Sequence, residues 1–474
     1  MELIEIFVLI IFVLGYFFIT IEHTIKIDKL IPALAAMALS WGLIALNYKS
    51  FGSWFDFKKK KIVTADEIKQ IEPDYLPKDA DPILNFIEES LLHHLGLTSE
   101  ILVFLIGAMT IVEIIDYFNG FNVFQKIINF KSKVTVLWVF SGLAFILSAI
   151  IDNLTATIVL ISILQKIVAD KKLRIWYAAL IVVTANAGGA WSPIGDVTTT
   201  MLWIQKKVSV LNLIQYLLIP SIVCAVIAAG IASLLPAFKG NIKLKPVNDD
   251  ANKYSLRMLI IGLLSIVFVP IFKVITDLPP YVGMMLALAI VSIFAEIYSN
   301  RDFQLSKATG PDPHGNVNES KHHESPVHNA LTKIELPSIL FFLGILMAVA
   351  ALETIGLLFT SAEFLKAEID LNLLMVIFGF ASAVIDNVPL VAASIGMFPE
   401  TVSDDQLWHL LAYCAGTGGS MLIIGSAAGV VAMGMEKINF FWYLKNILWI
   451  ALLAYFAGIA VFMLMKDFIT PITA

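Results

Sequence analysis

The sequence predicts an all-α polytopic membrane protein with two inverted repeats, each holding five membrane spans, a re-entrant hairpin and a broken helix. Three observations predict this fold: a very apolar composition, a polar heptapeptide that occurs twice, and two glycine-rich breaks in apolar segments. Of the 474 residues, 58% are hydrophobic and 15% are charged, and the mean hydropathy is +0.84. This composition excludes a soluble domain. Cys224 and Cys414 both lie in apolar segments, so no disulfide framework is expected.

Two near-identical stretches place a carboxylate and an amide in the middle of apolar runs. They are SAIIDNL at residues 148–154 and SAVIDNV at residues 382–388. An ionisable group at bilayer depth costs roughly 2.5–3.5 kcal/mol on insertion scales, so its presence twice in the same frame indicates a function. We expect the two stretches to form two halves of one ion or substrate site.

The first repeat is expected over residues 1–237, and two features interrupt its spans. Residues 134–168 could form one long helix, two spans or a re-entrant hairpin; we favour the hairpin, because each apolar arm is short for a crossing and Asp152 lies between the arms. Residues 174–203 are predicted as a broken helix, because three glycines and Pro193 within residues 188–195 cannot sustain a regular helix. The other spans are expected at Leu3–Ile21, Leu30–Leu46, Glu100–Ile115 and Leu211–Leu235, with a polar extramembrane segment and short interfacial helices before the third.

The same order of features recurs after a cytoplasmic linker expected at residues 238–257. The second repeat is expected over residues 258–474, with a hairpin at 371–398 and a broken helix at 407–435. Asp386 follows Asp152 by 234 positions and Gly418 follows Gly188 by 230, so the features repeat at nearly one offset. Five crossings per repeat is an odd number, which predicts that the second repeat is inverted. Its spans are expected at Met258–Ile275, Tyr281–Ile297, Ile339–Leu358 and Phe440–Met465, and a disordered cytoplasmic loop with several histidines is expected at 299–337.

Lysine and arginine in the short loops predict the orientation. Cations gather at residues 126–133, at residues 166–174 and in the linker, whereas the acidic loop 400–405 lies on the other side. The positive-inside rule therefore places the first side in the cytoplasm and both termini outside.

Asp152 and Asp386 are the first candidates for binding a cation and a proton. A buried carboxylate can alternate between a proton and a sodium ion, and Asn153 and Asn387 add neutral oxygens of the kind that hard cations prefer. The sequence therefore predicts an Na+ site at these four residues. The structural alternative is that each aspartate only caps a hairpin tip.

A third carboxylate, Asp196, follows the break in the first repeat, where the second repeat has Ser426. Asp196 could bind the proton or a second cation, or it could only cap the helix that follows. Seven small polar residues are further candidates for the site: Asn186, Ser148, Ser382, Thr198, Thr199, Thr417 and Ser420. The alternative for each is a structural one, because small polar residues also hold membrane helices together. Interfacial positions are expected for Glu113, Asp116 and Glu353, and His93 and His94 are expected in a loop, either solvated or sensing pH.

These motifs resemble the NhaD-type sodium/proton antiporters of the ion transporter superfamily, which also contains arsenite permeases and sodium/dicarboxylate symporters. The resemblance rests on the paired aspartate–asparagine stretches and on TANAGGAWSPIGDVTT at residues 184–199, and it covers nearly the whole chain. It implies exchange of Na+ or Li+ for H+ in a bacterial inner membrane. It also implies a homodimer in which a hairpin-bearing transport domain slides against a scaffold domain. We expect no enzymatic activity, no bound cofactor and no nucleic-acid partner.

An arsenite, oxyanion or carboxylate permease of the same superfamily is the alternative. Its site should offer helix N-termini and cations to the anion, and we expect no lysine or arginine near either tip. The dicarboxylate branch carries Ser-Asn-Thr where this chain has DNL and DNV, which argues against a dianionic substrate. An intramembrane aspartyl protease is a different class, and its Gly-x-Gly-Asp motif is matched only at residues 193–196, where Pro193 replaces the first glycine.

Overall fold

The computed structural model describes residues 3–70, 81–124, 130–242, 253–308, 325–470 and 472, and this part of the chain is helical apart from one hairpin of two short strands. The first half contains α1 (Leu3–Thr20), α2 (Glu22–Ile25), α3 (Leu30–Leu46), β1 (Ser53–Asp56), β2 (Lys61–Thr64), α4 (Ala65–Gln70), α5 (Pro82–Tyr117), α7 (Lys133–Ile151), α8 (Asn153–Ile167), α9 (Lys171–Gly189), α10 (Val197–Ile204) and α11 (Val210–Ser233). The second half contains α12 (Ser255–Thr276), α13 (Pro280–Ala308), α14 (Pro326–Lys333), α15 (Leu336–Thr354), α16 (Leu357–Glu368), α17 (Leu371–Ser382), α18 (Asn387–Met397), α19 (Gln406–Gly418), α20 (Ala427–Glu436), α21 (Phe440–Asn446) and α22 (Leu448–Met465).

The prediction of a multi-pass helical membrane protein is confirmed. Within the described residues, eight helices are long and apolar enough to cross a membrane: α1, α5, α7, α11, α12, α13, α15 and α22. Residues 134–168 form two helices that meet at Asp152. Because α7 has 19 residues, longer than the arm we expected and long enough to cross a membrane, the re-entrant hairpin stays a prediction beside the alternative of two spans. Residues 174–203 and 407–435 are each broken into two helices, α9–α10 and α19–α20.

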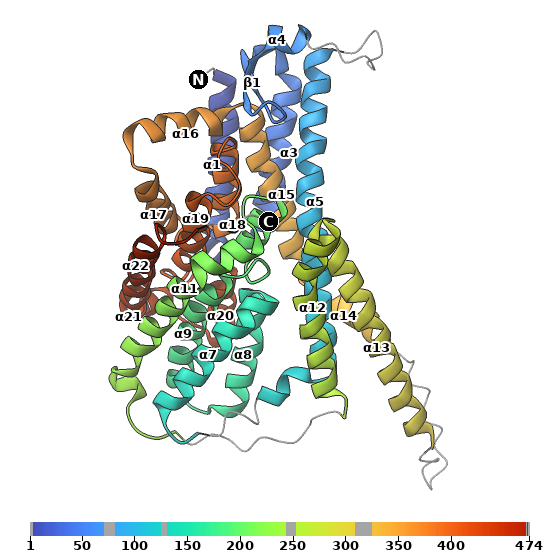
Figure 1. Ribbon diagram of the computed structural model, residues 1–474, viewed down its shortest axis with the longest axis vertical. Helices are drawn as coiled ribbons and strands as arrows, with labels where there is room; N and C mark the ends of the chain where they lie inside the picture. The colour runs from blue at the N-terminus through green and yellow to red at the C-terminus, as the bar shows by residue number, and fades with distance from the viewer. Residues whose placement is uncertain are drawn as a thin grey trace.

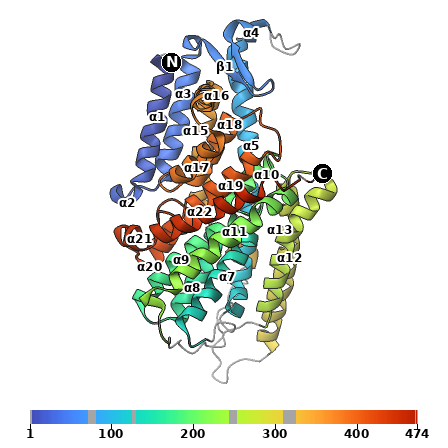
Figure 2. The same cartoon turned by 60° about the vertical axis from the view of Figure 1, so that its left-hand side comes forward.

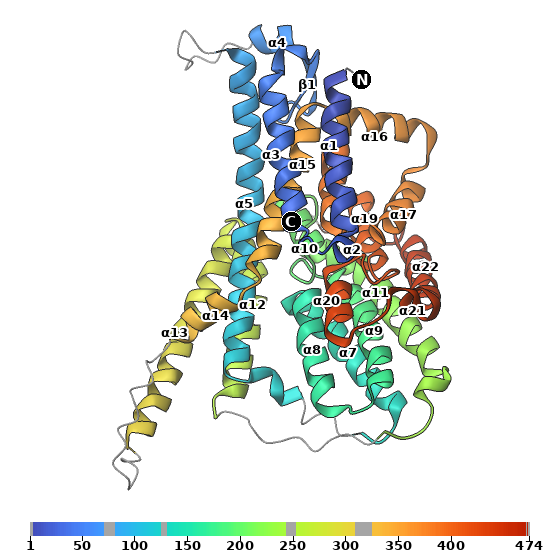
Figure 3. The ribbon, with the colours of Figure 1, turned by 180° about the vertical axis from the view of Figure 1, so that it is seen from behind.

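The helices pack in two groups (Figures 1 and 3). In what we call the α5 group, α1, α3 and α15 pack together, and α5 packs against α12, α13, α14 and α15. In the site group, α7, α8, α9 and α11 pack together, α17 packs on α19, and α20 packs on α8 and α9. The two groups meet where α15 contacts α18 and where α5 contacts α10. Figure 2 shows α19 and α22, from the end of the chain, lying across α9 and α11 from its first half.

The segment before residue 118 differs from our expectation. We predicted a span at Glu100–Ile115 after a polar loop, but α5 runs for 36 residues from an N-cap at Asp81. His93 and His94 therefore lie on a helix and not in a loop, and the ring of His93 stacks on Phe57 with 4.0 Å between centroids. Phe57 lies in the turn of the β1–β2 hairpin, where we expected short helices. The turn contacts the polar first part of α5 at His93, through Phe57, and at Glu89, through Lys58, while Glu88 and Glu89 stay exposed.

Three other features lie outside our sequence-based prediction or outside the described residues. Helix α16 follows α15, where no helix was predicted. In the histidine-containing loop predicted at 299–337, α13 continues to Ala308 and α14 begins at Pro326, while residues 309–324 lie outside the described residues. The linker predicted at 238–257 contains the start of α12, and its residues 243–252 also lie outside the described part.

Two glycines at equivalent places let each broken helix approach its neighbouring helix. A Cβ on Gly188 of α9 would lie 2.2 Å from the Phe145 carbonyl oxygen of α7, and a Cβ on Gly418 of α19 would lie 2.1 Å from the Gly379 carbonyl oxygen of α17. Atoms do not approach this closely, so both positions require glycine. Each broken helix is therefore packed backbone to backbone against the first arm of its hairpin.

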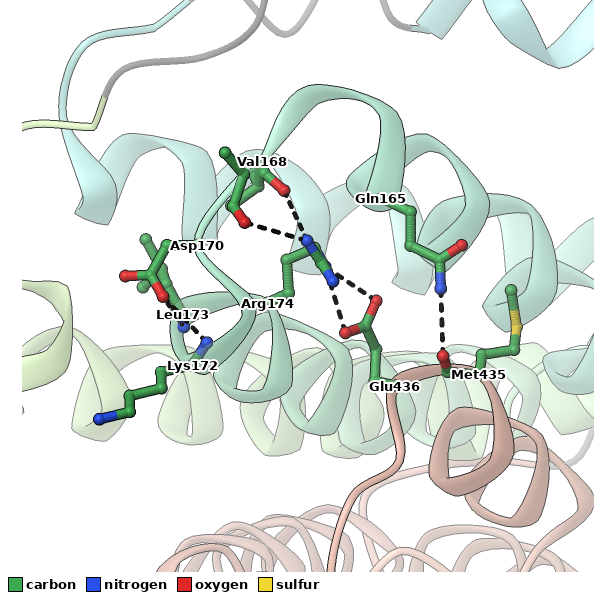
Figure 4. Close-up of polar contacts among 9 residues, drawn as sticks. Gln165, Val168, Asp170, Lys172, Leu173, Arg174, Met435 and Glu436 are labelled. Atoms are coloured by element: carbon green, nitrogen blue, oxygen red, sulfur yellow. Dashed lines mark hydrogen bonds and ion pairs between the residues drawn. The ribbon is translucent and has the colours of Figure 1, made fainter.

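A buried ion pair joins the two halves at the end of α20 (Figure 4). The Nε of Arg174 donates to both carboxylate oxygens of Glu436, at 3.0 and 3.2 Å, and Glu436 is 1% exposed. The same guanidinium donates from Nη1 to the carbonyl oxygens of Val168 and Ala169. Beside it, the Gln165 amide donates to the Met435 carbonyl oxygen at 3.2 Å. These contacts fix α20 against α8 and α9.

Candidate functional site

A small cavity lies where the two helix groups meet, and we call it the central cavity. Its volume is about 30 Å³, and its polar lining comes from Asp152, Asn153, Asp196, Asp386 and Asn387. The α5 group contributes an apolar wall that includes Leu105, Met109, Ile339 and Phe342. A cavity needs about 10–15 Å³ to hold one water molecule, so this volume suits one or two waters or a single small ion. The structure thus brings both hairpin tips and the first helix break to one cavity.

The carboxylate of Asp196 lies at the centre of the polar network. The Asn153 amide donates to its Oδ2 at 2.6 Å, and the Asn387 amide donates to the two oxygens at 3.3 and 3.2 Å. The backbone N–H and the hydroxyl of Thr198 donate to Oδ1 at 2.9 and 2.8 Å, so Asp196 also caps α10. Asp196 is 2% exposed. Asp196 therefore both caps α10 and belongs to the polar network of the site.

The network continues from Asn153 into the second helix break. The Asn153 amide also donates to Asn186 Oδ1 at 3.1 Å, and the Asn186 amide donates to Ser426 Oγ at 3.0 Å. Ser426 caps α20 by accepting from the Gly429 N–H, as Asp196 caps α10. The two equivalent cap residues, one acidic and one neutral, are thus linked through two buried amides.

Asp152 forms the tip between α7 and α8 in a conformation that is unusual for a residue with a side chain. Its φ is 70° and its ψ is 158°, a region populated almost entirely by glycine. Its carboxylate accepts from the Thr155 N–H and the Thr155 hydroxyl, both at 2.8 Å. Asp152 is therefore an N-cap that also presents its carboxylate to the central cavity.

Asp386 is capped and paired differently. Its carboxylate accepts from the Val388 N–H at 3.3 Å, and the Lys29 Nζ lies 3.7 Å from its Oδ2. Our expectation that no lysine or arginine lies near either tip is therefore wrong. Lys29 precedes α3 in the α5 group, and it reaches the tip because the folded chain brings the start of α3 beside the second hairpin.

Most of the predicted hydroxyl residues lie behind the cavity and bind backbone carbonyls. Ser148 donates to Ala185 O at 2.6 Å, and Ser382, at the equivalent place, donates to Ala415 O at 2.7 Å. Backbone carbonyls are also the acceptors for the hydroxyls of Thr199, Thr417 and Ser420. Freed carbonyls at membrane depth require such partners, so these hydroxyls stabilise the breaks that shape the site, and a direct role in cation binding stays a prediction.

Three further cavities border the central one or lie along the same helices. The Glu113 cavity, of about 300 Å³, is lined by Glu113, Asp116 and Lys166 and shares Leu154 and Thr155 with the central cavity. The Lys29 cavity, of about 100 Å³, is lined by Glu22, Asp28, Lys29 and Glu335 and shares Leu154, Ser338 and Ala427 with it. The Glu353 cavity, of about 140 Å³, contains His93, His94 and Lys207.

The chemistry of the central cavity suits a small cation. Asp152, Asp196 and Asp386 all line it. Among the described residues, however, no three histidine, cysteine, aspartate or glutamate side chains form a group that could hold a metal ion, so the three carboxylates do not converge on one point. Carboxylate and amide oxygens are ligands for hard, weakly held cations. A cation at Asp196 would replace the two amide N–H donors, and rotation of the amides would turn their oxygens toward it.

The sequence was then compared with known proteins. Residues 7–409 match the CitMHS family, which is described as Citrate transporter. The chain belongs to the CitMHS family. This family is one of transporters and not of enzymes, as the sequence predicted.

The CitMHS chain is also similar to several characterised relatives. It is 38% identical over 402 residues to "Sodium/proton antiporter 2" of Arabidopsis thaliana, a match that covers 83% of this chain and 92% of that protein. It is 42% identical over 379 residues to "Sodium/proton antiporter 1" of the same plant, covering 79% of this chain and 63% of that protein. It is 28% identical over 478 residues to "Na(+)/H(+) antiporter NhaD" of Vibrio cholerae, covering 97% of this chain and 91% of that protein. The resemblance to NhaD-type proteins is therefore confirmed.

A solved structure supports the fold of this CitMHS member. The YdaH transporter of Alcanivorax borkumensis matches 93% of this chain and 99% of its own with a TM-score of 0.56, at 13% sequence identity. That likeness concerns the fold alone.

Two site residues escaped the sequence analysis. Lys29 gave no signal, because a single lysine before an apolar helix is typical of a membrane interface. Thr155 gave a weak sequence signal. It lies three residues after Asp152, the spacing at which a side chain binds the N-cap residue of a helix.

Proposed function

We propose that this chain exchanges Na+ or Li+ for H+ across a membrane, with buried aspartates alternately binding the cation and the proton. The observation that carries the proposal is the central cavity, where Asp152, Asp196 and Asp386 line a space that suits one small ion. The names of the relatives, which are sodium/proton antiporters, agree with Na+ and H+ as the transported ions.

A citrate, dicarboxylate or oxyanion substrate fits this cavity poorly. Sites for small organic ligands have volumes of roughly 300–1,000 Å³, about ten to thirty times the 30 Å³ found here. Helix N-termini attract anions, but those of α8, α10 and α18 are each occupied by the chain's own aspartate. Three carboxylates would also repel a carboxylate substrate. The family description as a citrate transporter therefore does not extend, in our proposal, to this chain.

In this proposal the site binds either the cation or the proton, but not both at once. A carboxylate that binds Na+ must first lose its proton, so Asp196 holds either the proton or the cation, and Asp152 and Asp386 supply further charge. The amides of Asn153 and Asn387 donate to the carboxylate of Asp196 in the structure. They would turn their oxygens to the cation when it binds.

The neighbouring cavities suggest the route to the site. The Glu113 and Lys29 cavities share lining residues with the central cavity, whereas the Glu353 cavity shares none. Lys166, one of the cations that mark the expected cytoplasmic side, lines the Glu113 cavity. We therefore propose that this conformation opens toward the cytoplasm.

The finer arrangement is proposed on the resemblance to NhaD-type antiporters and on the packing. The site group would be the transport domain and the α5 group the scaffold against which it slides, within a homodimer in a bacterial inner membrane. The equivalent contacts of Gly188 and Gly418, and of Ser148 and Ser382, support two inverted repeats. In this proposal both termini of the chain lie outside the cytoplasm.

Reconstitution into liposomes with a trapped pH dye tests the proposal. Addition of NaCl or LiCl should drive proton movement, whereas choline chloride, sodium-free citrate and arsenite should not. The Asp152→Asn and Asp386→Asn variants should each lose this exchange while still inserting, and Asp370→Asn, an N-cap change at α17 outside the cavity, should keep it.

Two results would contradict the proposal. One is near-normal exchange in both Asp152→Asn and Asp386→Asn. The other is an apparent Na+ affinity of the wild type that stays constant as the pH falls, because competition with protons requires it to weaken.

A further inference from the structure

Lys29 and Asp386 form an ion pair between the two helix groups. The Lys29 Nζ lies 3.7 Å from Asp386 Oδ2, and the two side chains are 18% and 12% exposed. The same ammonium lies 4.4 Å from the centroid of the Phe341 ring, a favourable position for a cation. Lys29 thus contacts a carboxylate of the central cavity on one side and an aromatic face of the α5 group on the other.

The residues around Lys29 offer its ammonium a second position, away from Asp386. The Lys29 cavity is lined by three carboxylate residues, Glu22, Asp28 and Glu335, and opens onto the residues that border the central cavity. An ammonium on a flexible four-carbon stem can move between such positions. The acidic lining also attracts cations from solution.

We propose that Lys29 is a tethered cation that neutralises Asp386 when the transported ion is absent and that the incoming Na+ or Li+ displaces. This inference rests on the proposed function and adds a residue that sets its affinity. A carboxylate at membrane depth is costly when unpaired. In this proposal Lys29 neutralises Asp386 in the empty site, and the bound cation neutralises it in the loaded site. The competition weakens cation binding, because each binding event must break the ion pair.

Replacement of Lys29 tests the competition directly. The Lys29→Gln variant should bind Na+ with a half-saturating concentration about fivefold lower than the wild type, the effect expected of a partly buried ion pair. Binding is measured as the rise in melting temperature of the purified protein with NaCl, at alkaline pH and with choline chloride to hold the ionic strength. Lys26→Gln, in the same α2–α3 connection, is the matched control and should titrate like the wild type. Equal midpoints for the two variants, or a higher midpoint for Lys29→Gln, would overturn the inference.

A second measurement uses the unmodified protein and does not depend on the variant folding. Reductive methylation of lysines, followed by mass spectrometry, should modify Lys29 faster in NaCl than in choline chloride, because Na+ releases its ammonium from Asp386. Lys26 and Lys273 serve as internal references. An unchanged rate at Lys29, in protein that exchanges Na+ for H+ in liposomes, refutes the tethered cation and leaves the proposed function standing. Protein without any Na+-driven exchange refutes the proposed function itself.

Discussion

Asn153 and Asn387 donate their side-chain amides to one carboxylate, that of Asp196. The two asparagines hold equivalent places in near-identical stretches, whereas the counterpart of Asp196 is Ser426. The centre of the site is thus a single acid that receives one amide from each half of the chain.

Asp196→Asn should raise the half-saturating Na+ concentration for exchange at least tenfold. Asparagine is as good an N-cap as aspartate, so α10 keeps its start and the change isolates the negative charge. A tenfold effect corresponds to about 1.4 kcal/mol of lost binding free energy. The measurement is the Na+ titration of exchange in liposomes, with Asp370→Asn as the control. Identical titration curves for the two variants would mean that Asp196 is only a cap.

Asp152→Gly should lose exchange and yet keep or raise the melting temperature. The φ of 70° at Asp152 stores about 1–3 kcal/mol of strain that glycine removes, and glycine as an N-cap costs only a few tenths of a kcal/mol. Asp386 has a φ of −48°, so Asp386→Gly gains no such relief and should melt lower than the wild type. A melting temperature of Asp152→Gly below that of Asp386→Gly would contradict this account.

Gly188→Ala and Gly418→Ala should each destabilise the protein strongly. The added methyl would overlap a backbone carbonyl oxygen in both cases, and such overpacking costs about 1–3 kcal/mol. Gly142→Ala is the control, since nothing lies within 4 Å of its added Cβ, and it should be neutral or stabilising. Thermal unfolding of the purified variants checks this, and a Gly188→Ala protein as stable as Gly142→Ala would show that α7 and α9 can move apart freely.

Replacing only Glu436 of the Arg174–Glu436 pair should destabilise the protein more than replacing both residues. Glu436→Gln leaves the partly buried guanidinium of Arg174, which is 18% exposed, without its carboxylate, and it should lower the free energy of unfolding by less than the about 3–5 kcal/mol of a fully buried pair. Arg174→Met combined with Glu436→Met should recover much of that stability, because no charge is then left unpaired. A double-mutant cycle on melting temperature measures the coupling, and strict additivity would exclude it.

Asp404 should stabilise the protein at neutral pH and lose that contribution only in strong acid. Burial raises the pKa of Asp404, but the His409 imidazole, the Ser209 N–H and the Asn212 amide outweigh burial and lower the pKa to about 2. Because this value is below the ordinary 3.8, the ionised carboxylate stabilises the fold above about pH 3.8 and ceases to do so as the pH falls through about 2.

The variant Asp404→Asn tests the contribution of this charge. Asparagine accepts the positive φ of 59° at this position, and the variant should melt at a lower temperature than the wild type at neutral pH. Unfolding of the variant and the wild type should converge as the pH approaches 2. Asp405→Asn, a change at the cap of α19, is the control, and a difference that persists unchanged into strong acid would refute the assignment.

The polar residues of the site could be predicted from the sequence because each contrasts with its surroundings. Asp152 and Asp386 are charged residues within apolar runs, and the glycines and Pro193 mark the breaks. The length of α5 could not be predicted in the same way. Hydropathy reports contact with lipid, and the polar first part of α5 is a helix whose residues Glu88 and Glu89 stay exposed while His93 contacts the β1–β2 hairpin.

The arrangement around the aspartates depends on tertiary contacts that a linear pattern does not contain. Both asparagines were predicted as ligands beside their own aspartates, yet both donate to Asp196. Lys29 and Asp386 lie in different halves of the chain. Their pairing depends on α15, which packs against both α3 and α18.

The polar network has a consequence for biosynthesis. Asn387 and Ser426 are translated long after Asn153, Asn186 and Asp196. A nascent chain that has inserted only its first half therefore holds Asn186 without Ser426 and Asp196 with one of its two amides. This intermediate exposes an incomplete polar patch inside the bilayer until the last helices arrive.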